Sequence, residues 1–178
     1  MATGHAPGYT FLTGGARSGK SSLAVRMAAD SGLDVTFIAT AEALDNEMTD
    51  RITRHQHERP ASWATVEAPR ALVAAVETAP AQSFLIVDCL SLWVSNLLLD
   101  GAADTESQAL SLRAALLERT SPSVVVTNEV GLGIVPDNAL ARSYRDVLGC
   151  VNAVVAAEAH TAFLLVSGRA LRLDAPPA

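Results

Sequence analysis

Residues 14–21 read Gly14-Gly15-Ala16-Arg17-Ser18-Gly19-Lys20-Ser21, which satisfies the full phosphate-loop pattern G-x-x-x-x-G-K-S. Tyr9–Thr13 before this stretch is a short apolar run typical of a strand, and Ser22–Ala29 after it has the composition of a helix. In this setting the glycines let backbone N–H groups turn toward a phosphate, and the helix N-terminus adds the positive end of its dipole. Lys20 would bridge the outer phosphates and Ser21 would hold Mg²⁺. The stretch therefore predicts a nucleoside triphosphate site at a strand-to-helix turn.

The composition indicates a compact globular protein rather than one that binds nucleic acid or spans a membrane. Of its 178 residues 49% are hydrophobic and 18% are charged, and the net charge is −6 without any run of Lys or Arg. No segment reaches the ~20 apolar residues that a membrane-spanning helix needs. Residues 1–8 lack the pattern of a signal peptide and are expected to form a flexible tail before a single domain at 9–174. We therefore expect a cytoplasmic protein.

Cysteine usage gives no sign of a disulfide framework or a metal site. The chain has two cysteines, Cys89 and Cys150, and their spacing is not that of metal ligands. We expect both side chains to be buried as apolar fillers.

Apolar runs alternate with helical patterns along the chain, which favours an α/β fold around a mainly parallel central sheet flanked by helices. The expected strands cover residues 9–13, 35–40, 84–88, 124–127 and 162–167. The expected helices cover 22–29, about 45–59, 90–99, 106–119 and about 138–159, with Pro60 ending the second of them. Residues 170–173 are expected to add an edge hairpin.

Asp88 follows the apolar run Phe84–Val87, at the carboxyl end of an expected strand. In phosphate-loop proteins a carboxylate in this place holds Mg²⁺, directly or through water. A strand can also end in Asp because the side chain caps the next helix, and this alternative stays open. Since a complete phosphate loop is present, we favour a magnesium site formed by Ser21 and Asp88.

The expected helix at 45–59 carries a histidine on its apolar stripe. The residues that share this face are Leu44, Met48, Ile52, His55 and Arg59. His57 points away from it. Arg51 and Arg59 flank His55 and make a phosphate clamp, and nearby cations lower the pKa of an imidazole and favour its neutral, nucleophilic form. Such an imidazole can attack phosphorus and form a phosphoramidate. The alternative is a structural histidine on an apolar helix face.

Two further segments carry polar candidates. Glu67 follows the Pro60 turn and could accept hydrogen bonds from a guanine edge or ribose hydroxyls, although composition alone favours a solvated carboxylate. Asn128 and Glu129 open a glycine-containing loop of the kind in which α/β proteins place substrate contacts, with ordinary turn formation as the alternative. The chain lacks the Asn-Lys-x-Asp guanine signature, which disfavours a switch GTPase of the Ras type.

Together these segments resemble the bifunctional adenosylcobinamide kinase/adenosylcobinamide-phosphate guanylyltransferase family of cobalamin biosynthesis. The similarity runs through nearly the whole chain from Thr10. The motifs that carry it are Thr13–Ser21, Ile38–Ala41, Arg51-Ile52, His55, Arg59-Pro60, Trp63–Glu67, Asp88–Leu98, Thr127–Pro136, Arg142, Tyr144–Asp146 and Val166–Gly168. Ordered motifs of this length are far more specific than a phosphate loop alone.

The resemblance implies a RecA-like P-loop NTPase fold and two successive reactions. A nucleoside triphosphate first phosphorylates the aminopropanol hydroxyl of adenosylcobinamide. GTP then donates GMP to that phosphate, which gives adenosylcobinamide-GDP and pyrophosphate. The position that matches the family's guanylyl-carrying histidine is His55, whereas His57 matches a variable position. The resemblance also implies a homotrimer with sites between subunits.

The resemblance assigns nucleotide contacts as well. The matching residues are Gly14, Gly15, Ala16, Arg17, Ser18, Gly19, Lys20, Ser21, Ala39, Thr40, Ala41, Gln56, His57, Glu58, Arg59, Glu67 and Asp88. Asp88 stands where some relatives carry Glu, and its role is open between a magnesium ligand and a guanosine contact. Also open are the kinase donor (ATP or GTP) and the general base (Asp88 or Glu129).

Two other functions fit the same sequence. The first is a simple P-loop kinase of a small molecule, in which His55 is structural. The second is a non-enzymatic nucleotide switch with a RecA-like surface. Transfer of GMP to a histidine would distinguish the family's function from a simple kinase. Transfer of any group to a corrinoid would distinguish it from a non-enzymatic switch.

Overall fold

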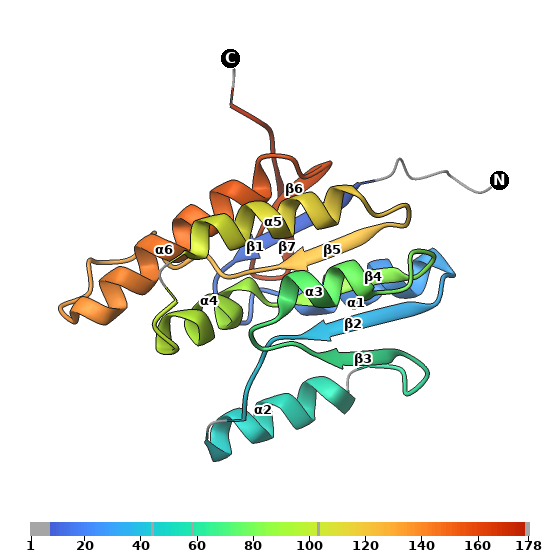
Figure 1. Ribbon diagram of the computed structural model, residues 1–178, viewed down its shortest axis with the longest axis horizontal. Coiled ribbons are helices and arrows are strands. Elements are labelled where there is room, and N and C mark those ends of the chain that lie inside the picture. Colours follow the sequence, from blue (N-terminus) through green and yellow to red (C-terminus); the bar gives the residue numbers. More distant parts are fainter. Residues whose placement is uncertain (1–7, 44, 58, 103, 177–178) are drawn as a thin grey trace.

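The computed structural model describes residues 8–43, 45–57, 59–102 and 104–176, which form a seven-stranded sheet with the order β3-β2-β4-β5-β1-β6-β7 (Figure 1). The strands are β1 (Tyr9–Gly14), β2 (Val35–Ala39), β3 (Ala64–Glu67), β4 (Phe84–Asp88), β5 (Ser123–Val126), β6 (Thr161–Val166) and β7 (Arg169–Leu173). Neighbouring strands are parallel except for β6 and β7, which form an antiparallel hairpin. Strands β1 to β6 therefore all end at the same edge of the sheet.

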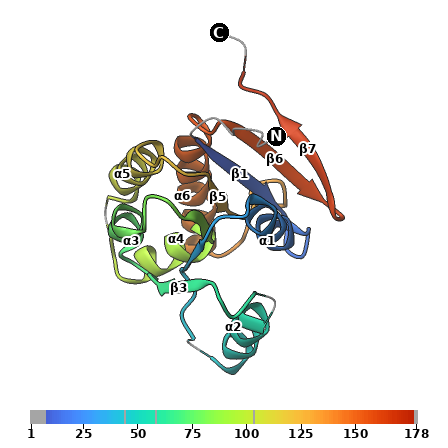
Figure 2. The same ribbon diagram turned by 90° about the vertical axis from the view of Figure 1, so that its right-hand side faces the viewer.

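Helices cover both faces of this sheet (Figure 2). They are α1 (Lys20–Ser31), α2 (Asn46–His57), α3 (Leu72–Thr78), α4 (Leu90–Leu99), α5 (Thr105–Leu117) and α6 (Ala139–Ala156). Helices α3 to α6 lie on one face and α1 on the other, while α2 lies outside both layers, beyond β3 (Figures 1 and 2).

The two covered faces give two hydrophobic cores. On β1, Tyr9 and Phe11 face the core under α3 to α6, whereas Leu12 faces the core under α1. Strands β4 and β5 are buried along nearly their whole length. Parallel strands covered on both faces need apolar side chains at every position. This is why these strands appear in the sequence as continuous aliphatic runs.

Most of the predicted elements are present, and the hairpin expected at 170–173 is confirmed as β7 paired with β6. Strand β3 and helix α3 were not predicted. All the residues of β3 are exposed, so the strand lacks apolar alternation, and α3 has only 7 residues. Cys89 is buried as predicted, but the prediction for Cys150 is wrong, because its side chain lies on the exposed side of α6.

The predicted N-terminal tail lies outside the described residues except for Gly8. Within the part of the chain that is described, no helix is long and apolar enough to cross a membrane.

A buried arginine, Arg119, lies at the amino end of the sheet, just after α5, and donates hydrogen bonds to the segments around it. Its Nε donates to Ser123 Oγ at 3.1 Å, and one terminal nitrogen donates to the Ser83 carbonyl at 2.7 Å and the Pro80 carbonyl at 3.2 Å. Burial lowers the pKa of this guanidinium. Because Ser83 precedes β4 and Ser123 begins β5, the side chain joins the starts of two central strands.

Candidate active site

The phosphate loop connects β1 to α1 and depends on glycine at both of its ends. Gly14 has a φ of 142°, and a Cβ there would lie 2.3 Å from the Leu165 carbonyl oxygen on the neighbouring strand. Gly19 has a φ of 100° immediately before the first residue of α1. Only glycine adopts these conformations without strain, and only glycine avoids the contact with Leu165. The two glycines of the motif therefore stand at the positions where the loop backbone requires glycine.

Lys20 is held against this loop, and its side chain is only 6% exposed. Its ammonium donates to the carbonyls of Gly14 at 2.8 Å and Gly15 at 2.7 Å, and to Ser18 Oγ at 3.3 Å. These three partners belong to the loop itself. The charge is thus fixed at the place where the sequence predicts that a triphosphate binds.

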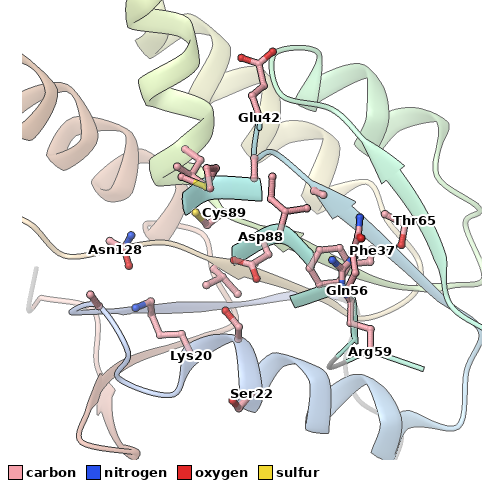
Figure 3. Close-up of a pocket in the computed structure, with 18 of the residues that line it drawn as sticks. Lys20, Ser22, Phe37, Glu42, Gln56, Arg59, Thr65, Asp88, Cys89 and Asn128 are labelled. Carbon is pink, nitrogen blue, oxygen red and sulfur yellow. Dashed lines mark hydrogen bonds between the residues drawn. The ribbon is translucent and has the colours of Figure 1, made fainter. Parts of the chain in front are cut away.

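A cavity of about 880 Å³ lies beside the loop, at the edge where the strands end (Figure 3). Its lining comes from the phosphate loop, the ends of β2, β4 and β5, helix α2 and strand β3. The predicted contacts that line it are Ala16, Arg17, Ser18, Gly19, Lys20, Ser21, Ala39, Ala41, Gln56, Arg59, Glu67 and Asp88. In an open parallel sheet this edge is the usual place for a ligand, and the volume suits a nucleotide.

Apart from His57 and Glu58, three of the predicted contacts are not among the cavity-lining residues. Gly14 and Gly15 form the start of the loop and supply carbonyls to Lys20. Thr40 is fully buried, and its hydroxyl donates to the Cys89 carbonyl at 2.7 Å and accepts from the Cys89 amide at 2.8 Å. The place of Thr40 in the structure is therefore beneath the cavity, where it joins the end of β2 to the end of β4.

Asp88 ends β4 at the cavity, on the side facing α1, and Ser21 lines the same space. Both residues also line a second, smaller cavity of about 440 Å³ that shares Arg59 and Phe37 with the first. Among the described residues no group of three His, Cys, Asp or Glu side chains is placed to hold a metal. A hydroxyl and a carboxylate suit Mg²⁺ when substrate phosphates supply its remaining oxygen ligands.

Helix α2 turns one face toward the cavity through Met48, Ile52 and Gln56, at helical spacing. Arg59, just beyond the helix, stacks its guanidinium over the Phe37 ring at 3.7 Å and donates to Thr65 Oγ1 at 3.5 Å. Of the predicted site residues on this segment, His55 and His57 belong to the α2 backbone, but their side chains, like that of Arg51, lie outside the described part of the structure. Glu58 lies wholly outside it.

Helix α4 holds the loops that line the cavity, a role that the sequence did not reveal. The Asn96 amide donates to the Thr40 carbonyl at 2.8 Å and the Pro69 carbonyl at 2.9 Å. Trp93 Nε1 donates to the Arg70 carbonyl at 2.9 Å. Asn96 and Trp93 are both buried, so their polar atoms need hydrogen-bond partners within the fold. A polar atom on an otherwise apolar helix is the sequence signal that could have identified them.

An ion-pair cluster continues this connection at the surface. The Arg70 guanidinium pairs with Glu42, which lines the cavity, and with Asp100, which follows α4. The hydrogen bond from Arg70 holds the pKa of the Asp100 carboxyl below its usual value. The loops after β2 and β3 are therefore joined to α4 in two ways, by the buried hydrogen bonds of Asn96 and Trp93 and by the exposed ion pairs of Arg70.

Of the two polar candidates after β5, Asn128 lines the cavity and Glu129 is not among the lining residues described. The Glu129 carboxylate accepts a hydrogen bond from the Gly131 amide of its own loop. The following residues expose large apolar side chains, with Leu132 84% and Ile134 97% exposed.

Comparisons with known proteins agree on a family and a fold. The family described as "Cobinamide kinase / cobinamide phosphate guanyltransferase" matches residues 10–173. Over 168 residues the chain is 44% identical to the "Bifunctional adenosylcobalamin biosynthesis protein CobP" of Pseudomonas aeruginosa, covering 93% of this chain and 97% of that protein. Over 177 residues it is 39% identical to the CobU protein of the same description from Escherichia coli, covering 91% and 97%.

Two solved structures share the fold at low sequence identity. The RadB recombinase aligns with a TM-score of 0.51 and 14% identity over 90% of this chain and 76% of its own. The flagellar accessory protein FlaH from Methanocaldococcus jannaschii aligns with a TM-score of 0.50 and 14% identity over 92% and 75%. The predicted RecA-like P-loop fold is therefore confirmed.

Proposed function

Because this chain belongs to the cobinamide kinase/cobinamide phosphate guanyltransferase family, we propose that it carries out two reactions at one nucleotide site. ATP or GTP phosphorylates adenosylcobinamide, and GTP then donates GMP to adenosylcobinamide phosphate through a guanylyl-His55 intermediate. The observation that carries this proposal is the cavity of about 880 Å³, at which the phosphate loop, Asp88 and helix α2 meet.

In the phosphorylation step, the substrate hydroxyl oxygen attacks the γ-phosphorus, and the bond from that phosphorus to its bridging oxygen breaks. Lys20 and the loop amides hold the charge that develops on the phosphoryl oxygens and on the departing diphosphate. The support for this role is the fixed position of the Lys20 ammonium, at hydrogen-bond distance from Gly14, Gly15 and Ser18.

In the guanylylation step, a neutral imidazole nitrogen of His55 attacks the α-phosphorus, and the bond to the bridging oxygen breaks to release pyrophosphate. A phosphate oxygen of the corrinoid substrate then attacks the same phosphorus and breaks the P–N bond. The support is the position of α2, whose residues Met48, Ile52 and Gln56 line the nucleotide cavity. Arg59 adds a positive charge at the same rim.

Mg²⁺ is the cofactor that this mechanism implies, and Ser21 with Asp88 would hold it. The ion would neutralise charge on the triphosphate and make pyrophosphate a better leaving group. The remaining predicted contacts, among them Arg17, Ala39, Ala41, Gln56, Glu67 and Arg59, would surround the nucleotide.

We also propose that the chain forms a homotrimer, in which a neighbouring subunit completes the site for a large corrinoid. The support is the loop after β5, where Leu132, Ile134 and Val135 are all more than half exposed. Apolar side chains gathered in this way on one loop indicate a protein interface. Light scattering after size-exclusion chromatography should give three chains per particle for the wild type and one for Leu132→Glu/Ile134→Glu; a monomeric wild type would overturn this assembly.

The function is tested by following both products. Purified protein with Mg²⁺ is incubated with adenosylcobinamide and either γ-³²P-ATP or γ-³²P-GTP, and then with α-³²P-GTP and adenosylcobinamide phosphate. We expect the γ-label in the corrinoid phosphate and the α-label in adenosylcobinamide-GDP. Transfer of the γ-label without the α-label would leave a simple P-loop kinase, and transfer of neither label would overturn the proposal.

A further inference from the structure

Strand β5 brings Asn128 between the two halves of the nucleotide site. In the sheet β5 lies between β1, which carries the phosphate loop, and β4, which carries Asp88. The strand register pairs Val126 with both Leu12 and Asp88. Residues just beyond Val126 are therefore level with the start of the phosphate loop on one side and with the turn into α4 on the other.

A shared acceptor fixes how close this segment is to Lys20. The Gly14 carbonyl oxygen accepts from the Lys20 ammonium at 2.8 Å and from the Glu129 amide at 3.2 Å. Two donors to one oxygen must lie side by side, so the backbone next to Asn128 adjoins the lysine charge. The Asn128 side chain lines the cavity together with Lys20 and Asp88, and Figure 3 shows these three labelled side chains around the same space.

The Asn128 side chain is held by a network of buried polar groups. Its Nδ2 donates to Ser91 Oγ at 2.9 Å, and Ser91 Oγ lies 2.9 Å from Cys89 Sγ. Ser91 is 1% exposed, so this hydroxyl is fixed within the fold. The Ser91 backbone carbonyl also accepts a hydrogen bond from the Tyr144 hydroxyl at 3.1 Å, which connects the start of α4 to α6.

The backbone of the same segment is held from the other side by α6. Asn152 Nδ2 donates to the Asn128 carbonyl at 3.0 Å, and Asn152 Oδ1 accepts from the Thr127 hydroxyl at 2.8 Å. A carbonyl can only accept, so the orientation of the Asn152 amide is determined by its partners. Two helices thus fix one asparagine at the rim of the cavity, which is the arrangement that a preorganised contact to a ligand requires.

We propose that Asn128 donates a hydrogen bond to the γ-phosphate of the bound nucleotide and makes the site selective for triphosphate over diphosphate. Ser91 takes one N–H of the carboxamide, and the second N–H is available to a phosphate oxygen in the cavity. This inference rests on the proposed function, in which one nucleotide site serves both reactions. Because the γ-phosphoryl group is transferred in the kinase step but leaves within pyrophosphate in the guanylyl step, Asn128 acts mainly on the kinase step.

The test measures nucleotide binding first, with Asn128→Ala made in a His55→Ala background, because the proposed guanylyl transfer to His55 would otherwise consume GTP during the titration. Calorimetry with Mg²⁺ should show GTP affinity falling about tenfold or more in Asn128→Ala, with GDP affinity changed by less than about twofold. In Asn128→Ala alone, at saturating nucleotide, the kinase rate should fall about 30- to 100-fold, and the rate of guanylylation by less than about threefold. The matched control is Asp104→Ala, which removes the N-cap of α5 away from the cavity and should alter neither affinity nor either rate.

A second variant separates a phosphate contact from a merely structural role. Asn128→Asp keeps the shape, and its carboxylate can accept a hydrogen bond from the Ser91 hydroxyl in place of the one that Asn128 donates, but it places a negative charge beside the phosphate. We expect this variant to bind GTP more weakly than Asn128→Ala, whereas a structural role predicts the reverse order. Equal losses of GTP and GDP affinity in Asn128→Ala would overturn the inference. A wild type that binds GTP but phosphorylates nothing would instead overturn the kinase half of the proposed function, and the GTP and GDP affinities would still decide the role of Asn128.

Discussion

The two ends of the central sheet each carry a buried cation bound to backbone carbonyls, but the origins of those carbonyls differ. At the amino end, Arg119 bonds to Pro80 and Ser83 in the loop before β4 and to Ser123 at the start of β5. At the carboxyl end, Lys20 bonds to partners within its own loop, beside the cavity. Arg119 therefore joins separate parts of the fold. Lys20 can exchange these loop partners for phosphate oxygens.

The largest effect is expected from removing the cation at the carboxyl end. Lys20→Met should lower kcat for both proposed reactions by about 10²- to 10³-fold, because developing phosphate charge would lose its fixed partner. The free energy of unfolding should change by less than about 1 kcal/mol, since the three hydrogen bonds described for Lys20 lie within one loop. Steady-state kinetics and urea unfolding measure the two quantities. A large loss of stability would show that Lys20 also supports the fold.

The opposite result is expected at the amino end. Arg119→Met should destabilise the protein by about 3 kcal/mol, because the Ser83 carbonyl and the buried Ser123 hydroxyl would lose the guanidinium that donates to them. Urea unfolding measures this change, and the affinity for GTP should stay at the wild-type value. Arg119→Lys is the matched control, and it should recover part of the stability because it keeps a donor but not the planar guanidinium. A fall in GTP affinity would contradict the separation of the two ends.

A mixed and smaller effect is expected for Asn96, which is structural but lies next to the site. Asn96→Leu leaves the Thr40 and Pro69 carbonyls without their donor, which should cost about 1–2 kcal/mol of stability. Because those carbonyls belong to loops that line or support the cavity, KM for GTP should rise more than kcat falls. Unfolding and kinetics on the same preparation test this. Unchanged KM with the full loss of stability would make α4 a support of the fold alone.

The smallest effect concerns the exposed Arg70–Asp100 pair. The folded-state pKa of Asp100 is lowered, so the pair contributes stability above the usual carboxyl pKa of 3.8 and loses it as pH falls through the lower folded value. In Arg70→Ala, NMR titration of the Asp100 carboxyl should give a pKa nearer 3.8. The same pKa in both proteins would exclude Arg70 as the cause.

The sequence was most informative about the carboxyl end of the sheet. The pattern at residues 14–21 placed the loop correctly, since the positive φ angles at Gly14 and Gly19 can be expected from the glycine spacing. Asp88 was found because it ends an apolar run, and the α2 stripe correctly included Met48 and Ile52 as cavity-facing positions. Each of these signals is local in the chain.

The remaining features depend on contacts between segments far apart in the sequence. Nothing near Arg119 in the sequence shows that its partners include Ser83, and nothing near Asn96 points to Thr40. The chain's pattern also left Phe37 as an ordinary strand residue, although it forms the platform for Arg59. Such roles follow from the strand order, which no single segment specifies.

The central claim is that this nucleotide site makes a guanylyl-enzyme, and labelling of the protein tests it most directly. Wild type, His55→Ala and His57→Ala are incubated with Mg²⁺ and α-³²P-GTP, denatured, and assayed for acid-labile label. We predict label on wild type and on His57→Ala and its loss in His55→Ala. Label that persists in His55→Ala, or a wild type that binds GTP without becoming labelled, would contradict the account.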